Sequence, residues 1–397
     1  MNSRGAVTMR RRPRYWVLGG VGAVAALLLI AGLVVRHETS ARSMEQRVLA
    51  ALGSPEDSLY RVRVGSSRLS LLGGTYVATG IEILPDSAAL RRRREAGKPV
   101  RNRFALRAAS FKAAGLDVWG LLRDRFKATS VVAESLLVEF YLDRTAPSLG
   151  DTLRRLPHEF FRTIAQPVRV DTFRLENSEF RYSERAIDGA RPGTIRFANT
   201  RIGVYDLSND TLRPNTPVVI ELQTRLAGTA PVTAGFEYDF RTPKLNLAYH
   251  GSVGDLDATR LNDMTVDLEG IRLASGHLDS AWFKFRVKDG VTDGEMQLLY
   301  RDLTAEFVNK VTGEGGLSEW LKTFVANSFM LRGENRWGGG DHPHRTVSIR
   351  GFVRTPNLPL PKYVWHTLRQ GLFLTIKGEP PKAGPKTQAK EVRPTGH

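Results

Sequence analysis

The chain has 397 residues, of which 41% are hydrophobic and 25% are charged, a composition that can bury a large core and excludes global disorder. It contains no cysteine, which excludes a disulfide framework, thiolate metal sites and a cysteine nucleophile. The formal net charge of +17 indicates a basic surface, which suits anionic lipid or nucleic acid, unless it reflects only an arginine-rich genome.

An apolar segment near the N-terminus predicts a transmembrane helix. Residues 16–35 read WVLGGVGAVAALLLIAGLVV and carry no charge, and a helix of that length spans roughly 30 Å. Residues 1–15 are basic, whereas the flank after the segment is mixed in charge. Positive charge is retained in the cytoplasm, so a cytoplasmic N-terminus and an exported C-terminal bulk are predicted. The residues that determine this topology are Arg10, Arg11, Arg12, Arg14, Tyr15 and Trp16.

A cleaved signal peptide is the alternative to this anchor. Signal peptides have an apolar region of roughly 7–15 residues that ends at a small-x-small site. The present segment is longer and runs into Val34-Val35-Arg36-His37, which favours an uncleaved anchor. Residues 36–60 are predicted to form a stalk, helical in its first part because apolar residues recur there at helical spacing.

Alternation of apolar and polar residues predicts that the rest of the chain is mainly β. Residues 218–226 and 232–240 both alternate, and the turn at Gly228-Thr229 between them predicts an antiparallel hairpin. Residues 281–287 repeat the pattern, and a further strand begins at Val347. A period of two gives each strand one apolar and one polar face.

Few helices are predicted. The candidates are residues 116–125, an amphipathic segment at 317–325, and residues 361–372. Four consecutive arginines at 91–94 are expected to lie in a solvated basic loop. Residues 379–397 are rich in proline, lysine and polar residues, which predicts a disordered tail.

No catalytic constellation is recognisable in the sequence. The H-E-x-x-H, G-x-S-x-G and P-loop patterns are all missing. His342 and His344 are close in sequence, but Pro343 between them and the glycines before them favour a solvated loop over a metal site. No pair of carboxylates stands in an apolar setting that would raise a pKa for acid catalysis. A protein that is not an enzyme, without cofactor, metal or nucleic-acid partner, is therefore predicted.

Three stretches together resemble the AsmA-like family of bacterial envelope proteins, the superfamily that includes TamB and YhdP. The first, from Gly115-Leu-Asp-Val-Trp-Gly-Leu-Leu to Leu142-Asp143, is similar to that family's unit of a short helix followed by a strand ending in an acidic residue. The second, from Gly251 to Leu303, is similar to its glycine-marked hairpins, and residues 363–372 resemble its closing helix.

The resemblance implies that residues 61–378 form a periplasmic domain anchored in the bacterial inner membrane. Its fold would be a curved antiparallel sheet that forms an open, apolar-lined groove with a few short helices. The implied function is binding or transfer of phospholipid, or support of outer-membrane assembly, and envelope proteins are further implied partners. Each CH₂ group of an acyl chain buried in such a groove would contribute roughly 0.8 kcal/mol of binding free energy. Arginines at the mouth of the groove would bind the phosphate head groups. The expected lining residues are Val218, Ile220, Leu222, Leu226, Val232, Phe236, Tyr238, Phe240, Phe283 and Phe285.

A closed β-sandwich with an ordinary core is the alternative fold, because its inward residues would show the same alternation. Such a domain would serve as a periplasmic scaffold that recruits protein partners through its sheet edges. A hydrolase whose site is assembled from distant segments is a third hypothesis.

Overall fold

The computed structural model describes residues 59–376 with internal gaps, together with Arg42, Glu45 and Gln46. The gaps are residues 122, 124, 148–155, 163, 165, 187–190, 210–216, 241, 308–332, 337–344 and 357. The predicted transmembrane helix, most of the predicted stalk, the segment at 317–325 and the predicted tail lie outside the described residues. Among the helices that are described, none combines the length and the apolar character needed to cross a membrane.

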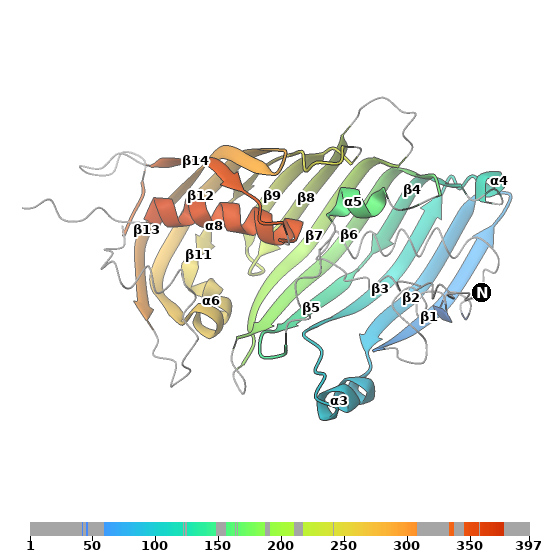
Figure 1. Cartoon of the computed structure of the whole chain (residues 1–397), viewed down its shortest axis with the longest axis horizontal. Helices are drawn as coiled ribbons and strands as arrows, with labels where there is room; N and C mark the ends of the chain where they lie inside the picture. Colours follow the sequence, from blue (N-terminus) through green and yellow to red (C-terminus); the bar gives the residue numbers. More distant parts are fainter. Residues whose placement is uncertain are drawn as a thin grey trace, which may run out of the picture.

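Fourteen strands of the described chain pair into one sheet, which dominates the molecule (Figure 1). The strands are β1 (Tyr60–Ser70), β2 (Thr75–Pro85), β3 (Asn102–Ala114), β4 (Phe126–Glu134), β5 (Leu137–Asp143), β6 (Val168–Arg185), β7 (Gly193–Ser208), β8 (Val218–Leu226), β9 (Ala230–Tyr238), β10 (Leu247–Val253), β11 (Leu256–Asp257), β12 (Ile271–Lys288), β13 (Val291–Phe307) and β14 (Thr346–Val353). Their order is β1-β2-β3-β4-β6-β7-β8-β9-β10-β12-β13-β14, while β5 pairs with β3 and β6, and β11 pairs with β12. The prediction of a mainly β fold is confirmed.

The prediction of a purely antiparallel sheet was wrong at one place, because β4 and β5 both run parallel to β6. Parallel neighbours need a crossover connection that returns the chain to the same end of the sheet. Residues 144–167 are that crossover and contain the short helix α5 (Pro157–Phe161). At its start Arg144 forms an ion pair with Glu184 of β6, beside the pair of Asp143 and Arg185 that joins the ends of β5 and β6. The sheet is therefore mixed.

The hairpin predicted from alternation is confirmed. Strands β8 and β9 are antiparallel, and Val218 faces Tyr238 across the pair. The second strand begins and ends two residues earlier than predicted. Ala227 and Gly228 form the turn with positive φ values of 51° and 78°, the backbone conformation that tight hairpin turns require.

Two of the three predicted helices can be checked. α8 (Leu360–Ile376) confirms the helix predicted at 361–372, and α4 (Val118–Leu121) is a single turn within the predicted range 116–125. The structure adds η2 (Ala258–Leu261) and α6 (Asn262–Glu269), which were not predicted.

The four arginines at 91–94 lie in a helix, α3 (Ser87–Glu95), so the prediction of a loop was wrong. Asp86 caps this helix by accepting a hydrogen bond from the Ala89 amide at 2.9 Å. Three of the arginines occupy its last turn, where positive charge is favourable near the helix C-terminus. The arginine side chains are largely exposed, as the prediction of a solvated segment requires.

Several strands are interrupted along one line across the sheet, here called the crease. Gly80 in β2, Ser135 between β4 and β5, Asn177 in β6 and Asn199 in β7 all have positive φ, between 48° and 60°. The strand registers place these residues beside the same line. A left-handed residue within a strand bends the strand and increases its twist. Aligned interruptions therefore bend neighbouring strands together.

Buried hydroxyl groups form hydrogen bonds with backbone groups at the crease. Ser178 Oγ donates to Glu176 O at 2.9 Å and accepts from the Leu136 amide at 3.3 Å. On the next strands, Thr200 Oγ1 donates to Phe197 O and Thr224 Oγ1 donates to Ala198 O, each at 3.1 Å. Such hydroxyls remove the cost of burying unpaired backbone polar groups.

Replacing Asn177 by Val should lower the free energy of unfolding by about 1–3 kcal/mol, because a β-branched residue is strongly disfavoured at positive φ. Asn177→Gly is the matched control and should cost less, because glycine adopts this conformation without a steric penalty. Thermal unfolding of the full chain, followed by circular dichroism, measures both. Equal stability of the two variants would contradict this view of the crease.

Candidate functional site

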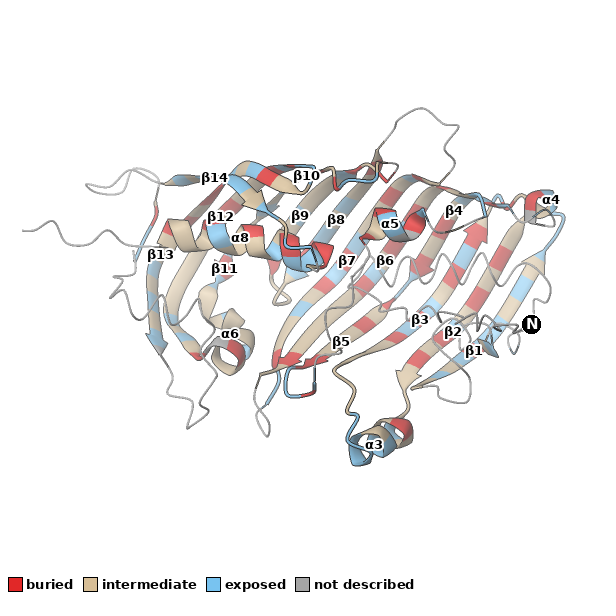
Figure 2. Ribbon diagram, viewed as in Figure 1, coloured by how far each residue is buried: buried red, intermediate tan, exposed pale blue. Residues whose placement is uncertain are grey.

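Helices α5, α6 and α8 lie on one side of the curved sheet (Figure 1), and this side is called the inner face. Buried and exposed residues alternate along the strands (Figure 2). The buried apolar residues of the inner face form one continuous cluster that runs from β1 to α8. The face that sequence periodicity marked as apolar is therefore the face on which the helices pack.

One transverse row of the inner face is fully covered. Register aligns Val218, Tyr238, Leu247, Val287 and Thr292 across β8, β9, β10, β12 and β13, and each is at most 3% exposed. Two helices seal this row, α5 over β9 and α8 over the start of β13.

A second row, four residues further along each strand, is different. Register aligns Ile202, Leu222, Ala234, Gly251 and Phe283 across β7, β8, β9, β10 and β12. All five are only partly buried. This row is called the inner strip. It ends at β13, where Met296 faces Phe283 and is buried.

An aromatic cluster separates the covered row from the inner strip. Phe236 stacks on Tyr249 with ring centroids 6.1 Å apart, and Tyr249 lies 5.3 Å from Phe285 and 6.2 Å from Phe283. Gly251 makes room for this arrangement, because a Cβ there would lie 2.5 Å from the Phe283 ring. The rings give the inner face a broad apolar floor.

Helix α5 is attached to the sheet by a buried histidine. His158 is 0% exposed, its Nδ1 lies 2.6 Å from the Tyr238 hydroxyl, and its Nε2 lies 3.3 Å from Pro243 O. A neutral ring with its proton on Nε2 satisfies both contacts. Burial lowers the pKa of His158 below its ordinary value of 6.5. Phe161 adds an edge-to-face contact with Phe240 at 5.5 Å.

Helix α8 packs on β13 and β14 through a stripe of residues spaced by four. Tyr363, Thr367, Gly371 and Thr375 are all buried. The Tyr363 hydroxyl lies 2.5 Å from Thr292 Oγ1 and 3.0 Å from the nearest main-chain carbonyl oxygen. At Gly371 an added Cβ would overlap the Met296 side chain, so the glycine permits the close approach of the helix.

The neighbouring flank of α8 is apolar. Val364, Leu368 and Leu372 are partly buried and pack against the core cluster. Helix α6 contacts β7 and β12, where Leu268 lies against Gly193. The inner strip therefore lies on a face bordered by α8 and by α6, and neither helix fully buries it.

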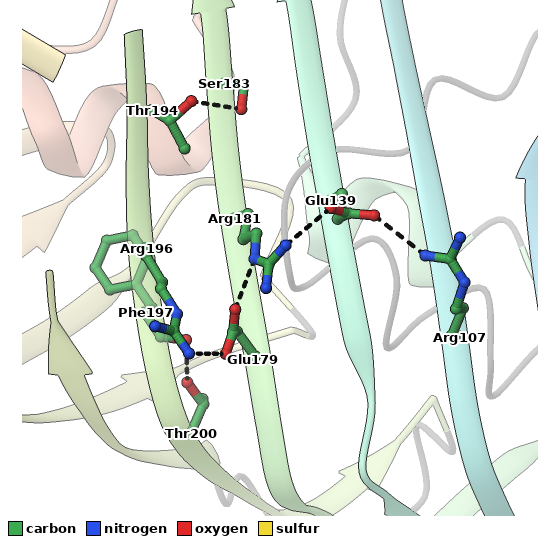
Figure 3. Close-up of polar contacts among 9 residues, drawn as sticks. All are labelled: Arg107, Glu139, Glu179, Arg181, Ser183, Thr194, Arg196, Phe197 and Thr200. Atoms are coloured by element: carbon green, nitrogen blue, oxygen red, sulfur yellow. Dashed lines mark hydrogen bonds and ion pairs between the residues drawn. The ribbon is translucent and has the colours of Figure 1, made fainter. Parts of the chain in front are cut away.

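The outer face of the sheet has the opposite chemistry (Figure 3). A ladder of ion pairs crosses β3, β5, β6 and β7: Arg107–Glu139 at 3.2 Å, Arg181–Glu139 at 3.3 Å, Arg181–Glu179 at 2.6 Å and Arg196–Glu179 at 2.6 Å. The two arginine neighbours hold the pKa of Glu179 below its usual range. These pairs keep the outer face solvated.

All ten predicted lining residues are on the inner side, in β8, β9 and β12 or directly after β9. Those that are buried are Val218, Tyr238, Phe240 and Phe285; those that are partly exposed are Ile220, Leu222, Leu226, Val232, Phe236 and Phe283. Sequence reasoning missed Ile202, Ala234, Tyr249 and Gly251. Ala234 was within reach, because it stands in the alternation of its strand, whereas the interruptions in β7 hide the alternation around Ile202. The six predicted topology determinants, Arg10 to Trp16, lie outside the described residues.

No cluster of three or more histidine, aspartate or glutamate side chains able to hold a metal ion occurs in the described part of the chain. The pair His342 and His344 lies outside that part. Neither a family model nor a curated protein sequence matches the chain.

His158 should make the stability of the fold depend on pH. Its pKa is lower in the folded state, so unfolding takes up a proton below about pH 6.5, and stability falls as the pH is lowered through that range. The contribution is at most about 1.4 kcal/mol per pH unit. The free energy of unfolding of the full chain, measured between pH 7.5 and about 5.5, tests this prediction. In His158→Gln that free energy should fall less steeply as the pH is lowered. Identical pH profiles of the two proteins would contradict this role.

Proposed function

We propose that the chain is a membrane-anchored, periplasmic AsmA-like protein, not an enzyme, that binds or transfers phospholipid, or supports outer-membrane assembly. The observation that carries the proposal is the inner strip. Five apolar residues on five neighbouring strands stay partly exposed on the face that bears the core. A contiguous apolar row of this kind favours a binding surface.

The length of the inner strip supports an acyl chain as the ligand. From β7 to β12 it crosses four strand spacings of about 4.8 Å each, or roughly 19 Å. One leaflet of a membrane contributes about half of the roughly 30 Å hydrocarbon core. A phospholipid tail laid across the strands would therefore contact most of the strip, and each buried CH₂ contributes about 0.8 kcal/mol.

Charge favours an anionic lipid. The chain carries a formal charge of +17, and positive protein surfaces attract the head groups of anionic lipids. The net charge does not select a particular head group.

The described strands pair into a single sheet, which supports the groove over the closed β-sandwich considered as the alternative. A scaffold function does not depend on that sandwich. A scaffold would contact protein, and not lipid, at the inner strip. Photo-crosslinking at Leu222 distinguishes these two kinds of contact.

A photo-crosslinking residue placed at Leu222 of the full chain in its native membrane should form phospholipid adducts that mass spectrometry identifies. The same residue at Gln223 is the matched control, because neighbouring residues of a strand point to opposite faces and Gln223 is exposed on the outer one. Adducts with protein alone at position 222 would favour the scaffold function. Equal lipid labelling at both positions would reject the strip as the binding surface.

Leu222→Asp should reduce phospholipid that co-purifies with the full chain several-fold, whereas Gln223→Asp should leave it unchanged. Both variants introduce an aspartate into β8, so the low β propensity of aspartate affects the two variants equally. Protease resistance reports whether each variant folds. Unfolding by Leu222→Asp alone would indicate a sealed core, where an unpaired charge is buried, and would contradict the proposal.

A further inference from the structure

Three large apolar side chains are prominently exposed at one end of the sheet. Among the described residues, Leu71 is 63% exposed, Leu72 is fully exposed and Trp119 is 73% exposed. Leu71 and Leu72 form the turn between β1 and β2, and Trp119 lies on α4. The set of these three residues is called the tip.

The two parts of the tip are joined by the backbone. The Leu116 amide donates to Gly74 O at 2.9 Å, which attaches the β1–β2 turn to the residues before α4. Gly74 has a φ of 51°, and a Cβ there would lie 2.9 Å from Leu116 O, so a glycine is needed for this contact. The turn and α4 lie at the same corner of the molecule (Figure 1). The turn and α4, which carry the three apolar side chains, are therefore held next to each other.

Positive side chains lie close to the tip in sequence and in strand register. The exposed cations near it are Arg68, Lys112, Arg123, Arg125 and Lys127. Arg68 and Lys112 flank Val77 on neighbouring strands. Asp117 lies in the same region, and its carboxylate accepts a hydrogen bond from the Gly120 amide at 2.8 Å within the α4 turn. Exposed apolar residues with lysine and arginine nearby match the chemistry of an anionic membrane surface.

The strand that leads to the tip is close in sequence to the predicted anchor. The Glu45 carboxylate accepts a hydrogen bond from the Val64 amide of β1 at 2.8 Å. Ten residue steps separate Glu45 from the end of the predicted transmembrane segment at Val35, so the two lie within about 35 Å even if that chain is fully extended. A membrane surface is thus within reach of β1.

We propose that the tip inserts Leu71, Leu72 and Trp119 into the interface of an anionic membrane, with the surrounding lysines and arginines at the phosphate level. Water contact with Leu72 is then replaced by lipid, and the indole of Trp119 takes the interfacial position that this side chain prefers. Docking would orient the sheet relative to the membrane. It does not depend on lipid binding at the inner strip.

The absence of cysteine from the sequence makes a direct test possible. Leu72→Cys and Ser87→Cys, each labelled with an environment-sensitive fluorophore, are compared in the full chain reconstituted in vesicles. Ser87 is the control, because it is exposed at the start of α3, beyond the other end of β2. Vesicles contain phosphatidylglycerol mixed with phosphatidylcholine, or phosphatidylcholine alone.

The label at position 72 should shift its emission to the blue and be quenched by lipids that carry a quencher on the acyl chain. The shift should be weaker in phosphatidylcholine alone and at high salt, which screens exposed charges. The label at position 87 should not shift. An unshifted label at position 72 in anionic vesicles would overturn the proposal. So would a blue shift without lipid quenching, which would indicate burial against a second copy. Neither outcome changes the lipid adducts expected at Leu222, so the two proposals fail separately.

Discussion

The shape of the molecule depends on continuous hydrogen bonding across a crease. A sheet can bend sharply without losing its ladder only where neighbouring strands are interrupted at the same line. Here Ser135, between β4 and β5, and Asn177 of the neighbouring β6 supply the left-handed backbone, and the hydroxyls of Ser178 and Thr200 form hydrogen bonds with the backbone. Alternation places the apolar residues of neighbouring strands on one face of the sheet, and the curvature makes this face the inner one.

The helices cover the inner face unevenly, because their contacts with the sheet are concentrated over one row of residues. α5 and α8 are held by polar anchors, His158 on Tyr238 and Tyr363 on Thr292, and these anchors lie over the same transverse row. Small residues such as Gly371 let α8 approach closely there. The inner strip lies beyond the anchored row and the aromatic cluster, four residues further along the strands, and it keeps partial contact with solvent.

The two proposed surfaces have different physical origins. The inner strip is apolar surface on a rigid central part of the sheet, and register alone assembles it. The tip is apolar surface on a turn and a single helical turn, joined by the contact between Gly74 and Leu116 and surrounded by cations. The inner strip suits an acyl chain laid across the strands, whereas the tip suits the surface of an anionic membrane.

The local pattern of apolar and polar residues was enough to predict several strands and the last helix. The alternation in residues 218–226 marked both the strand and its inner residues, and Pro361 with Gly371 marked the last helix. Local signals also misled: the run of arginines at 91–94 suggested a loop, although the cap at Asp86 is visible in the sequence and begins a helix. These features depend on neighbours in the chain, so they are accessible without a structure.

Only the tertiary structure decided which residues meet. The parallel pairing of β4 with β6 depends on where the crossover 144–167 returns. The inner strip depends on register between residues as distant as Ile202 and Phe283. Hydrogen bonds between strands far apart in sequence set that register, and a pattern of period two is compatible with many registers. The apolar face was therefore determined by the sequence, whereas the part of it that stays exposed was determined by the fold.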